Sequence, residues 1–166
     1  MRYLAIAAVM ILATASTVNA ETNLGLMGGG VRAGFRIDPD QFLVGGQLDL
    51  GDFATNLRFM PNASIGFGDN VTLISVNPEV HYVFRDNPVA DGMFFYTGGG
   101  LDIIHWSVDL PEPFDNATDT DLGLSLVGGI ELELSDSQSL LGEIRIVFED
   151  ESFFELVGGW NFDFSR

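Results

Sequence analysis

The chain has 166 residues with 24 acidic side chains, seven basic ones and no cysteine, which gives a formal net charge of -17. Binding to nucleic-acid phosphates requires a basic face, so this composition predicts no nucleic-acid partner. The length suits one domain, and without cysteine no disulfide framework holds that domain together. All basic residues are arginines, whose planar guanidinium groups favour paired positions over a freely solvated surface.

The N-terminal segment, residues 1–20, has the pattern of a secretory signal peptide. Arg2 precedes an apolar run that ends near residue 15, and the small-residue letters VNA close the segment before Glu21. The run is too short to span a bilayer as a helix. We therefore expect a cleaved signal peptide over residues 1–20 and a single mature domain over residues 21–166, with an uncleaved anchor as the alternative.

The mature part shows strand patterns and no helical period. Eight extended segments, separated by clusters of Gly, Pro, Asn and Asp, cover residues 23–37, 41–50, 54–67, 71–84, 93–108, 121–134, 139–148 and 153–164. Most have about ten or more residues, the length of a tilted membrane-spanning strand. An even number of strands with short connections predicts an all-β, eight-stranded, antiparallel up-and-down barrel, because closure removes both exposed edges.

The stretch GLSLVGGIELEL, residues 123–134, alternates between apolar and polar residues. A membrane barrel turns the apolar face to lipid, and a soluble lipocalin-like barrel turns it inward. The polar face of the strands carries Arg together with Glu, amides and small residues. This mixture fits a barrel interior of paired charges. We expect an interior polar network of Arg32, Arg36, Arg58, Glu79, His81, Glu131, Glu133, Glu143, Arg145 and Glu155. Alternation does not show which face of the segment 93–108 points inward, because the acidic Asp102 and the apolar Trp106 lie on the same face.

Aromatic residues gather near strand ends, as lipid–water interfaces select. One expected belt contains Phe35, Phe42, Phe67, Phe148 and Phe154, and the other contains Tyr82, Phe84, Phe94, Phe95, Phe162 and Phe164. Two such rims favour a membrane barrel over a soluble one.

Together with the C-terminal letters GWNFDF, these features resemble the small outer-membrane barrels of OmpA/OmpX type over the whole mature chain. The resemblance implies a Gram-negative outer membrane, contact with its lipid and lipopolysaccharide, insertion by the barrel-insertion machinery, and no cofactor. In that family the last residue is usually aromatic, whereas Ser165 and Arg166 follow Phe164 here. An eight-stranded barrel is just wide enough for its own side chains, so we expect a filled lumen and no open pore.

Two sequence features raise the question of chemistry. His105 and Ser107 share a face of one strand, and Asp119 or another acid in the following loop would orient the imidazole ring. The His-x-Ser spacing of residues 105–107 resembles that of outer-membrane lipid A deacylases. That family continues the triplet with Asn-Ala, whereas this chain continues with Val108-Asp109, so we expect no catalytic site. His81 lies two residues from Glu79, which fits an interior hydrogen-bond network better than a metal site.

The expected loops are acidic, and the acidic residues on one rim are Asp38, Asp40, Asp69, Asp109, Glu112, Asp115, Asp119, Glu149, Asp150 and Glu151. Divalent cations bridging to lipid headgroups would use such loops, although solvated acidic loops have the same composition. We expect a non-catalytic envelope protein with a structural or surface-contact role, for which the loop of residues 109–120 is the best surface. The alternatives are a deacylase-like enzyme using His105 and Ser107, and a soluble periplasmic barrel holding an apolar ligand.

Overall fold

The computed structural model describes residues 22–37, 40–68, 71–108, 117–149 and 152–164, so the expected signal peptide lies outside the described residues. Within these ranges the chain forms ten strands: β1 (Asn23–Ile37), β2 (Gln41–Ala54), β3 (Leu57–Phe59), β4 (Asn62–Gly68), β5 (Val71–Asn77), β6 (Glu79–Val83), β7 (Met93–Val108), β8 (Ala117–Ser135), β9 (Gln138–Phe148) and β10 (Ser152–Asp163). No helix in the described part of the chain is long and apolar enough to cross a membrane.

The ten strands close into one antiparallel barrel, because β1 pairs with β10 on one side and with β2 on the other. Two of the eight predicted segments are each divided in two: the third into β3 and β4, and the fourth into β5 and β6. The pairing continues across both interruptions, since Arg58 lies opposite His81 and Asn62 lies opposite Asn77. The predicted eight-stranded barrel is therefore confirmed, with two of its eight strands each interrupted once.

The interruptions coincide with prolines. Pro61 separates β3 from β4, and Pro78 separates β5 from β6. Proline has no backbone N–H and cannot donate to a strand ladder. Backbone hydrogen bonds continue between adjacent strands at both interruptions. The backbone N–H of Met60 donates to the carbonyl of Glu79, and that of Leu48 donates to the carbonyl of Pro61, both at 2.9 Å.

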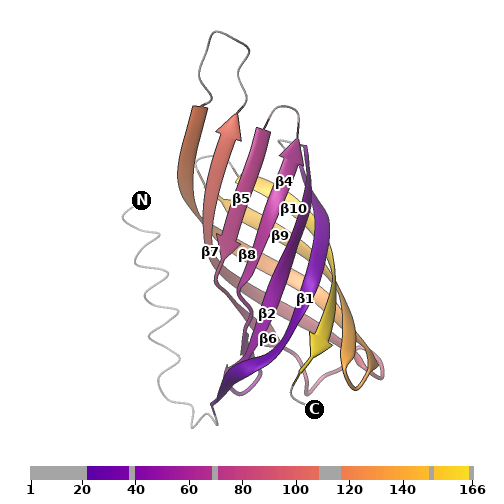
Figure 1. Ribbon diagram of the computed structural model, residues 1–166. Coiled ribbons are helices and arrows are strands. Elements are labelled where there is room, and N and C mark those ends of the chain that lie inside the picture. Colours follow the sequence, from indigo (N-terminus) through magenta and orange to yellow (C-terminus); the bar gives the residue numbers. More distant parts are fainter. Residues whose placement is uncertain (1–21, 38–39, 69–70, 109–116, 150–151, 165–166) are drawn as a thin grey trace.

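The barrel has two distinct ends (Figure 1). At the loop end, β1 stops at Ile37 and β7 stops at Val108; at the terminal end, β1 begins, β10 stops and the residue 84–92 connection joins β6 to β7. The strand β8 pairs with β7 as far as Ala117 but with β9 only from Leu124 onward. The β7–β8 hairpin therefore extends beyond β9 at the loop end, and among the described residues no strand pairs with the other edge of β8 over residues 117–123.

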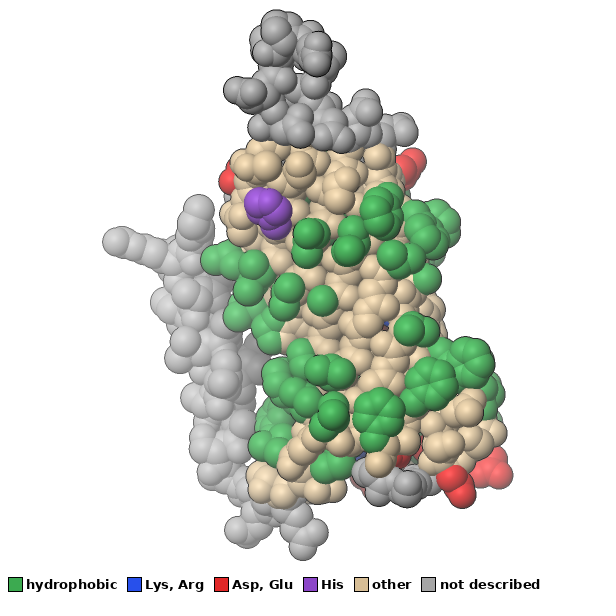
Figure 2. Space-filling model, viewed as in Figure 1, with side chains coloured by type: hydrophobic (Ala, Val, Ile, Leu, Met, Phe, Trp, Pro, Cys, Tyr) green, Lys and Arg blue, Asp and Glu red, His purple; other side chains and the backbone are tan. Residues whose placement is uncertain are grey.

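The apolar face of GLSLVGGIELEL points outward. Leu122, Leu126 and Leu134 are 76%, 57% and 51% exposed, whereas Ser125 and Glu131 are buried. Apolar side chains lie over the outer wall in Figure 2, while charged ones appear mainly toward its ends. The alternative of a soluble barrel with its apolar side chains inside is therefore wrong.

The structure also shows which residues of β7 face the barrel interior. Its even-numbered residues face inward, so that Asp102 and Ile104 are 1% and 0% exposed while Leu101 and Ile103 point outward. Alternation could not show this phase, because an acidic and an apolar residue follow each other along the same interior row.

Candidate functional site

The barrel interior holds a cluster of buried charged side chains, here called the charged chamber. It draws on five strands that are distant in sequence, and its members are Arg32, Arg36, Glu79, His81, Asp102, Glu143, Arg145 and Glu155. Every member lies on the inward parity of its strand, because successive side chains of a strand point to opposite faces of the sheet. Asp102 is the one member that the sequence analysis did not include.

Arg145 is the centre of the charged chamber. Its guanidinium nitrogens lie 2.5 Å from Glu79, 3.4 Å from Asp102 and Glu143, and 3.5 Å from Glu155. A single cation thus faces four carboxylates, all of them buried. Buried charges are costly unless they are paired, so these contacts hold the strands β6, β7, β9 and β10 in one arrangement.

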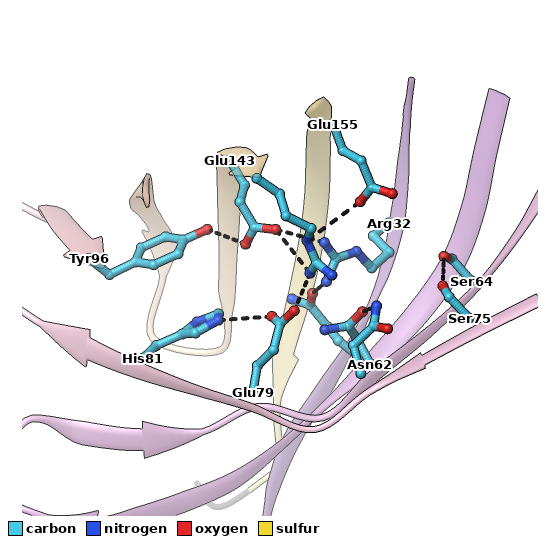
Figure 3. A network of polar contacts seen from close by, with 12 residues as sticks. Arg32, Asn62, Ser64, Ser75, Glu79, His81, Tyr96, Glu143 and Glu155 are labelled. Atoms are coloured by element: carbon cyan, nitrogen blue, oxygen red, sulfur yellow. Dashed lines mark hydrogen bonds and ion pairs between the residues drawn. The ribbon is translucent and has the colours of Figure 1, made fainter. Parts of the chain in front are cut away.

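Further contacts complete the chamber. Arg32 pairs with Glu143 at 2.8 Å, and Arg36 pairs with Glu155 at 2.7 Å. The Tyr96 hydroxyl donates to Glu143 at 3.0 Å, and the Tyr96 ring stacks on that of His81 at 4.9 Å between centroids. Figure 3 shows Tyr96 and His81 side by side, reaching Glu143 and Glu79 respectively.

Within this chamber Glu79, His81 and Glu143 bring three potential metal ligands within 4.8 Å of one another. The guanidinium of Arg145 lies 2.5 Å from Glu79 and 3.4 Å from Glu143. A fixed positive charge therefore occupies the space beside these carboxylates. The arrangement fits an ion-pair network better than a metal centre, because a metal ion would have to displace or tolerate that charge.

A second, smaller charged group lies nearer the terminal end. Arg58 pairs with Glu131 at 2.6 Å and with Asp49 at 3.5 Å, and the Ser139 hydroxyl donates to Glu131 at 2.7 Å. These residues line a polar cavity of about 370 Å³, together with Asn161 among others. The lumen therefore contains a hollow polar space at this end.

Toward the loop end the interior is apolar. Leu43, Leu73, Ile104, Val147 and Phe153 form one buried cluster, with Trp106 packed against it. The guanidinium of Arg36 lies 3.8 Å from the centroid of the Phe153 ring, which joins this layer to the charged chamber by a cation–π contact. The prediction of a filled lumen named only polar residues, and the structure adds this apolar layer.

Two predicted placements require correction. Glu133, expected in the interior network, is exposed near the end of β8, although Glu131 two residues earlier is buried. Phe94, expected in an aromatic belt, instead packs against the interior cluster of Val83, Tyr96 and Val127. Near a barrel rim the lumen opens to solvent, so inward parity no longer implies burial for Glu133.

The aromatic residues of the two expected belts, apart from Phe94, lie on the outer wall: Phe35, Phe42, Phe67, Tyr82, Phe84, Phe95, Phe148, Phe154, Phe162 and Phe164 are all exposed. Neighbouring rings meet within each group, since Phe35 contacts Phe42 and Tyr82 contacts Phe84 at 5.3 Å and 5.0 Å between centroids. Exposed aromatic rims of this kind suit the interfaces of a bilayer.

The structure does not assemble His105, Ser107 and Asp119 into a catalytic triad. His105 Nδ1 lies 2.9 Å from the Thr120 hydroxyl, and the Asp119 carboxylate accepts a hydrogen bond from the backbone N–H of Thr120. Asp119 lies opposite Trp106 and Thr120 lies opposite His105. Asp119 and His105 therefore lie on opposite faces of the sheet, where the carboxylate cannot orient the imidazole ring.

Of the ten acidic rim residues, Asp40, Asp119 and Glu149 are in the described part of the chain. The others lie outside the described residues.

Comparison with solved structures identifies this arrangement as the fold of small outer-membrane β-barrels. The Neisserial surface protein A structure matches with a TM-score of 0.71 at 16% identity, over 86% of this chain and 99% of that one. The N-terminal barrel domain of Pseudomonas aeruginosa OprF matches with a TM-score of 0.64 at 14% identity, over 84% and 99%. The attachment invasion locus protein Ail of Yersinia pestis matches with a TM-score of 0.55 at 9% identity, over 84% and 100%.

No protein-family model and no curated protein sequence matches the chain. The similarity to these barrels is thus one of fold, and the chain is a transmembrane β-barrel of the kind that the resemblance to the OmpA/OmpX type implied.

Proposed function

We propose that this chain is an outer-membrane barrel with a closed lumen and no catalytic role, which acts in envelope structure or in contacts at its loop end. The filling of the lumen carries this proposal. Below the loop end, the apolar layer around Leu73 and Ile104 crosses the interior, and Arg145 with its four carboxylates crosses the middle. Side chains packed in this way leave no continuous aqueous path for a solute.

The projecting β7–β8 hairpin is the surface that we propose for contacts. In the described part of the chain, no strand pairs with one edge of β8 over residues 117–123. A free strand edge offers backbone groups to another extended chain. Asp119 and Asp121 lie on this edge, and the Asp119 carboxylate accepts from the backbone N–H of Thr120. Charged side chains on an edge resist indiscriminate pairing, so the edge favours a partner that brings positive charge.

The carboxylates of Asp119 and Asp121 make this hairpin acidic, whereas a site that binds a polyanion needs positive charge. Ail has been solved in complex with the heparin analogue sucrose octasulfate, at a TM-score of 0.53 and 9% identity to this chain. A sulfated ligand is repelled by carboxylates unless cations intervene. We therefore propose a cationic protein segment at this edge, or anionic lipopolysaccharide bridged to acidic loops by divalent cations.

Two measurements test the closed outer-membrane barrel. The full chain is expressed in a Gram-negative host, and the outer-membrane fraction is run on a detergent gel with and without boiling. We expect a boiling-dependent shift in mobility, because a closed barrel resists detergent until it is heated. In planar bilayers we expect no sustained conductance; a steady open channel would contradict the closed lumen, and a soluble protein without the shift would contradict the location.

The deacylase alternative has a separate test. Ser107→Ala removes the only hydroxyl that the triplet could use as a nucleophile. We expect lipid A composition in the host to be the same with the wild-type chain, with Ser107→Ala and with an empty vector. Shortened lipid A that depends on Ser107 would establish the enzyme and overturn the non-catalytic proposal.

A further inference from the structure

The glycines of the barrel wall fall into two kinds. At Gly34 and Gly45 an added Cβ would collide with a carbonyl oxygen of the adjacent strand, so the close approach of the backbones requires glycine there. At Gly128 and Gly142 an added Cβ would meet no heavy atom within 4 Å, and at Gly158 the nearest atom would be 3.9 Å away.

The fold gives no reason for glycine at these last three positions. All three are exposed, and positive φ among the described glycines is confined to Gly51 and Gly92. Glycine inside a strand costs about 0.5–1 kcal/mol relative to alanine. Three such positions side by side therefore indicate that the missing side chains leave space for something outside the barrel.

These positions form one sunken row that runs obliquely, because Gly128 lies two residues from Ile130, the residue directly opposite Gly142. Gly142 lies directly opposite Gly158, Gly158 lies opposite Ala33, and Gly128 lies one strand further on, opposite Ile144. The row crosses β8, β9, β10 and β1, which spans about 14 Å at the usual strand spacing of about 4.8 Å. Exposed bulky side chains flank it on both sides, namely Leu126, Ile144 and Leu156 toward the loop end and Ile130, Leu140 and Trp160 toward the terminal end.

The sunken row is the floor of an outer groove with a volume of about 1250 Å³. At one end of the groove lie Phe35 and Phe42, whose rings meet edge to face at 5.3 Å between centroids. At the other end lie Phe84, Phe95 and Asn87, in or beside the connection from β6 to β7 at the terminal end. The groove thus extends obliquely from one aromatic rim to the other across β8, β9 and β10; these three strands are coloured orange to yellow in Figure 1.

We propose that this outer groove binds one acyl chain of a glycerophospholipid, with the headgroup at the Asn87 end. The groove lies between the two aromatic rims, at the depth of the hydrocarbon, where a void would forfeit dispersion contacts. A single chain lying on the glycine floor touches the barrel on three sides, whereas a chain on a flat wall touches it on one. The floor is one residue row wide between ridges, which suits a chain better than the broad surface of a second barrel.

The Asn87 end indicates which lipid. Asn87 is the one amide side chain that lines the groove among the described residues, and it lies at the terminal end. The contacts proposed at the loop end require that end to face the outside of the cell, so the terminal end faces the periplasmic leaflet. The proposal rests on this orientation, and it selects a glycerophospholipid rather than lipid A, whose headgroup would sit at the loop end.

The test is photolabelling of the refolded full chain in phospholipid vesicles that contain a trace of phosphatidylethanolamine with a diazirine on its acyl chain. Cross-linked peptides are mapped by mass spectrometry. We expect labelling of the segments that contain Gly128, Gly142 and Gly158 to exceed that of the outward residues of β4 and β5 several-fold. The variant Gly128→Leu/Gly142→Leu fills the groove where a Cβ is unobstructed, and we expect it to reduce this labelling to the level of β4 and β5.

Thr72→Leu is the matched control, since it adds bulk to the outer wall of β5 away from the groove. The boiling-dependent gel shift reports folding for every variant, and a filled-groove variant that fails to fold is replaced by Gly142→Val alone. Uniform labelling of the wall, or full labelling of the filled variant, would overturn the groove proposal. So would cross-links between two barrels, or enrichment only with a diazirine-bearing lipid A in a parallel experiment.

The two proposals fail in distinguishable ways. A wild-type chain that shows the gel shift without enriched labelling refutes the groove alone. A wild-type chain that shows no gel shift refutes the membrane barrel, and the groove proposal falls with it.

Discussion

The two ends of the lumen are lined by side chains of different chemistry. Toward the loop end Leu73, Ile104 and Phe153 pack into an apolar layer, and toward the terminal end Arg58 and Glu131 line a polar cavity of about 370 Å³. An apolar layer needs only close packing, whereas buried charges need specific partners. The loop end of the interior is therefore held by close packing, and the middle and the terminal end are held by ion pairs.

The inward-facing side chains therefore change from apolar to charged along the barrel axis. Arg145 and Val147 are two residues apart on the inward face of β9, yet one binds carboxylates and the other joins the apolar layer. Substitutions in the charged chamber and in the apolar layer should destabilise the barrel for different reasons. The following variants compare the two regions by the free energy of unfolding. That quantity is measured by urea titration in vesicles, with the fluorescence of Trp106 and Trp160 as the signal.

The largest effect is expected from Arg145→Ala in the charged chamber. The variant leaves Glu79, Asp102, Glu143 and Glu155 without their shared cation. Removing one partner of a buried ion pair costs about 3–5 kcal/mol. Arg85→Ala is the control, because Arg85 pairs with Asp52 in an exposed position, where such pairs contribute about 0–1 kcal/mol. Equal losses for the two variants would show that burial of the chamber does not determine its energetics.

The apolar layer is tested by Leu73→Ala. Leu73 is fully buried, and truncating it leaves a cavity beside Ile104 and Val147. We expect a loss of about 3 kcal/mol, within the range for buried Leu→Ala changes. Leu101→Ala provides the matched control, because Leu101 points outward and is exposed. If Leu101→Ala were as costly as Leu73→Ala, the lumen layer would not be a packed core.

A smaller effect is expected from Tyr96→Phe. The variant keeps the ring that stacks on His81 but removes the hydroxyl that donates to Glu143. A hydrogen bond to a charged group contributes about 1.5–3 kcal/mol, so we expect a loss of about 2 kcal/mol. An unchanged free energy of unfolding would mean that Arg32 and Arg145 alone satisfy Glu143.

The smallest effect is expected from Glu133→Gln. Glu133 is exposed near the end of β8, and substitutions at exposed sites usually change stability by less than about 0.5 kcal/mol. Glu131→Gln, two residues away, weakens the ion pair with Arg58 and should be clearly more destabilising. If the two variants were equally destabilising, the interior network would extend to the rim, as the strand pattern alone predicts.

Alternation was enough to predict the barrel and most of the residues inside it. Arg32, Arg36, Glu143 and Glu155 lie on strands whose period of two is uninterrupted, and the structure buries all four. Asp102 was not assigned, because Ile104 and Trp106 share its parity and the pattern alone could not show that an interior row changes from charged to apolar. The prolines Pro61 and Pro78 were visible in the sequence, but the continuity of pairing across them depends on the neighbouring walls.

The amino-acid pattern alone predicts eight strands with one apolar and one polar face, because a period of two assigns each side chain to one side of a sheet. The folded arrangement was needed to show that the apolar face points outward, which carboxylates share Arg145, and that Gly128, Gly142 and Gly158 lie in one groove. The physical reason is register: the partner of a residue is set by the stagger between strands, and it brings together residues that are far apart in the chain.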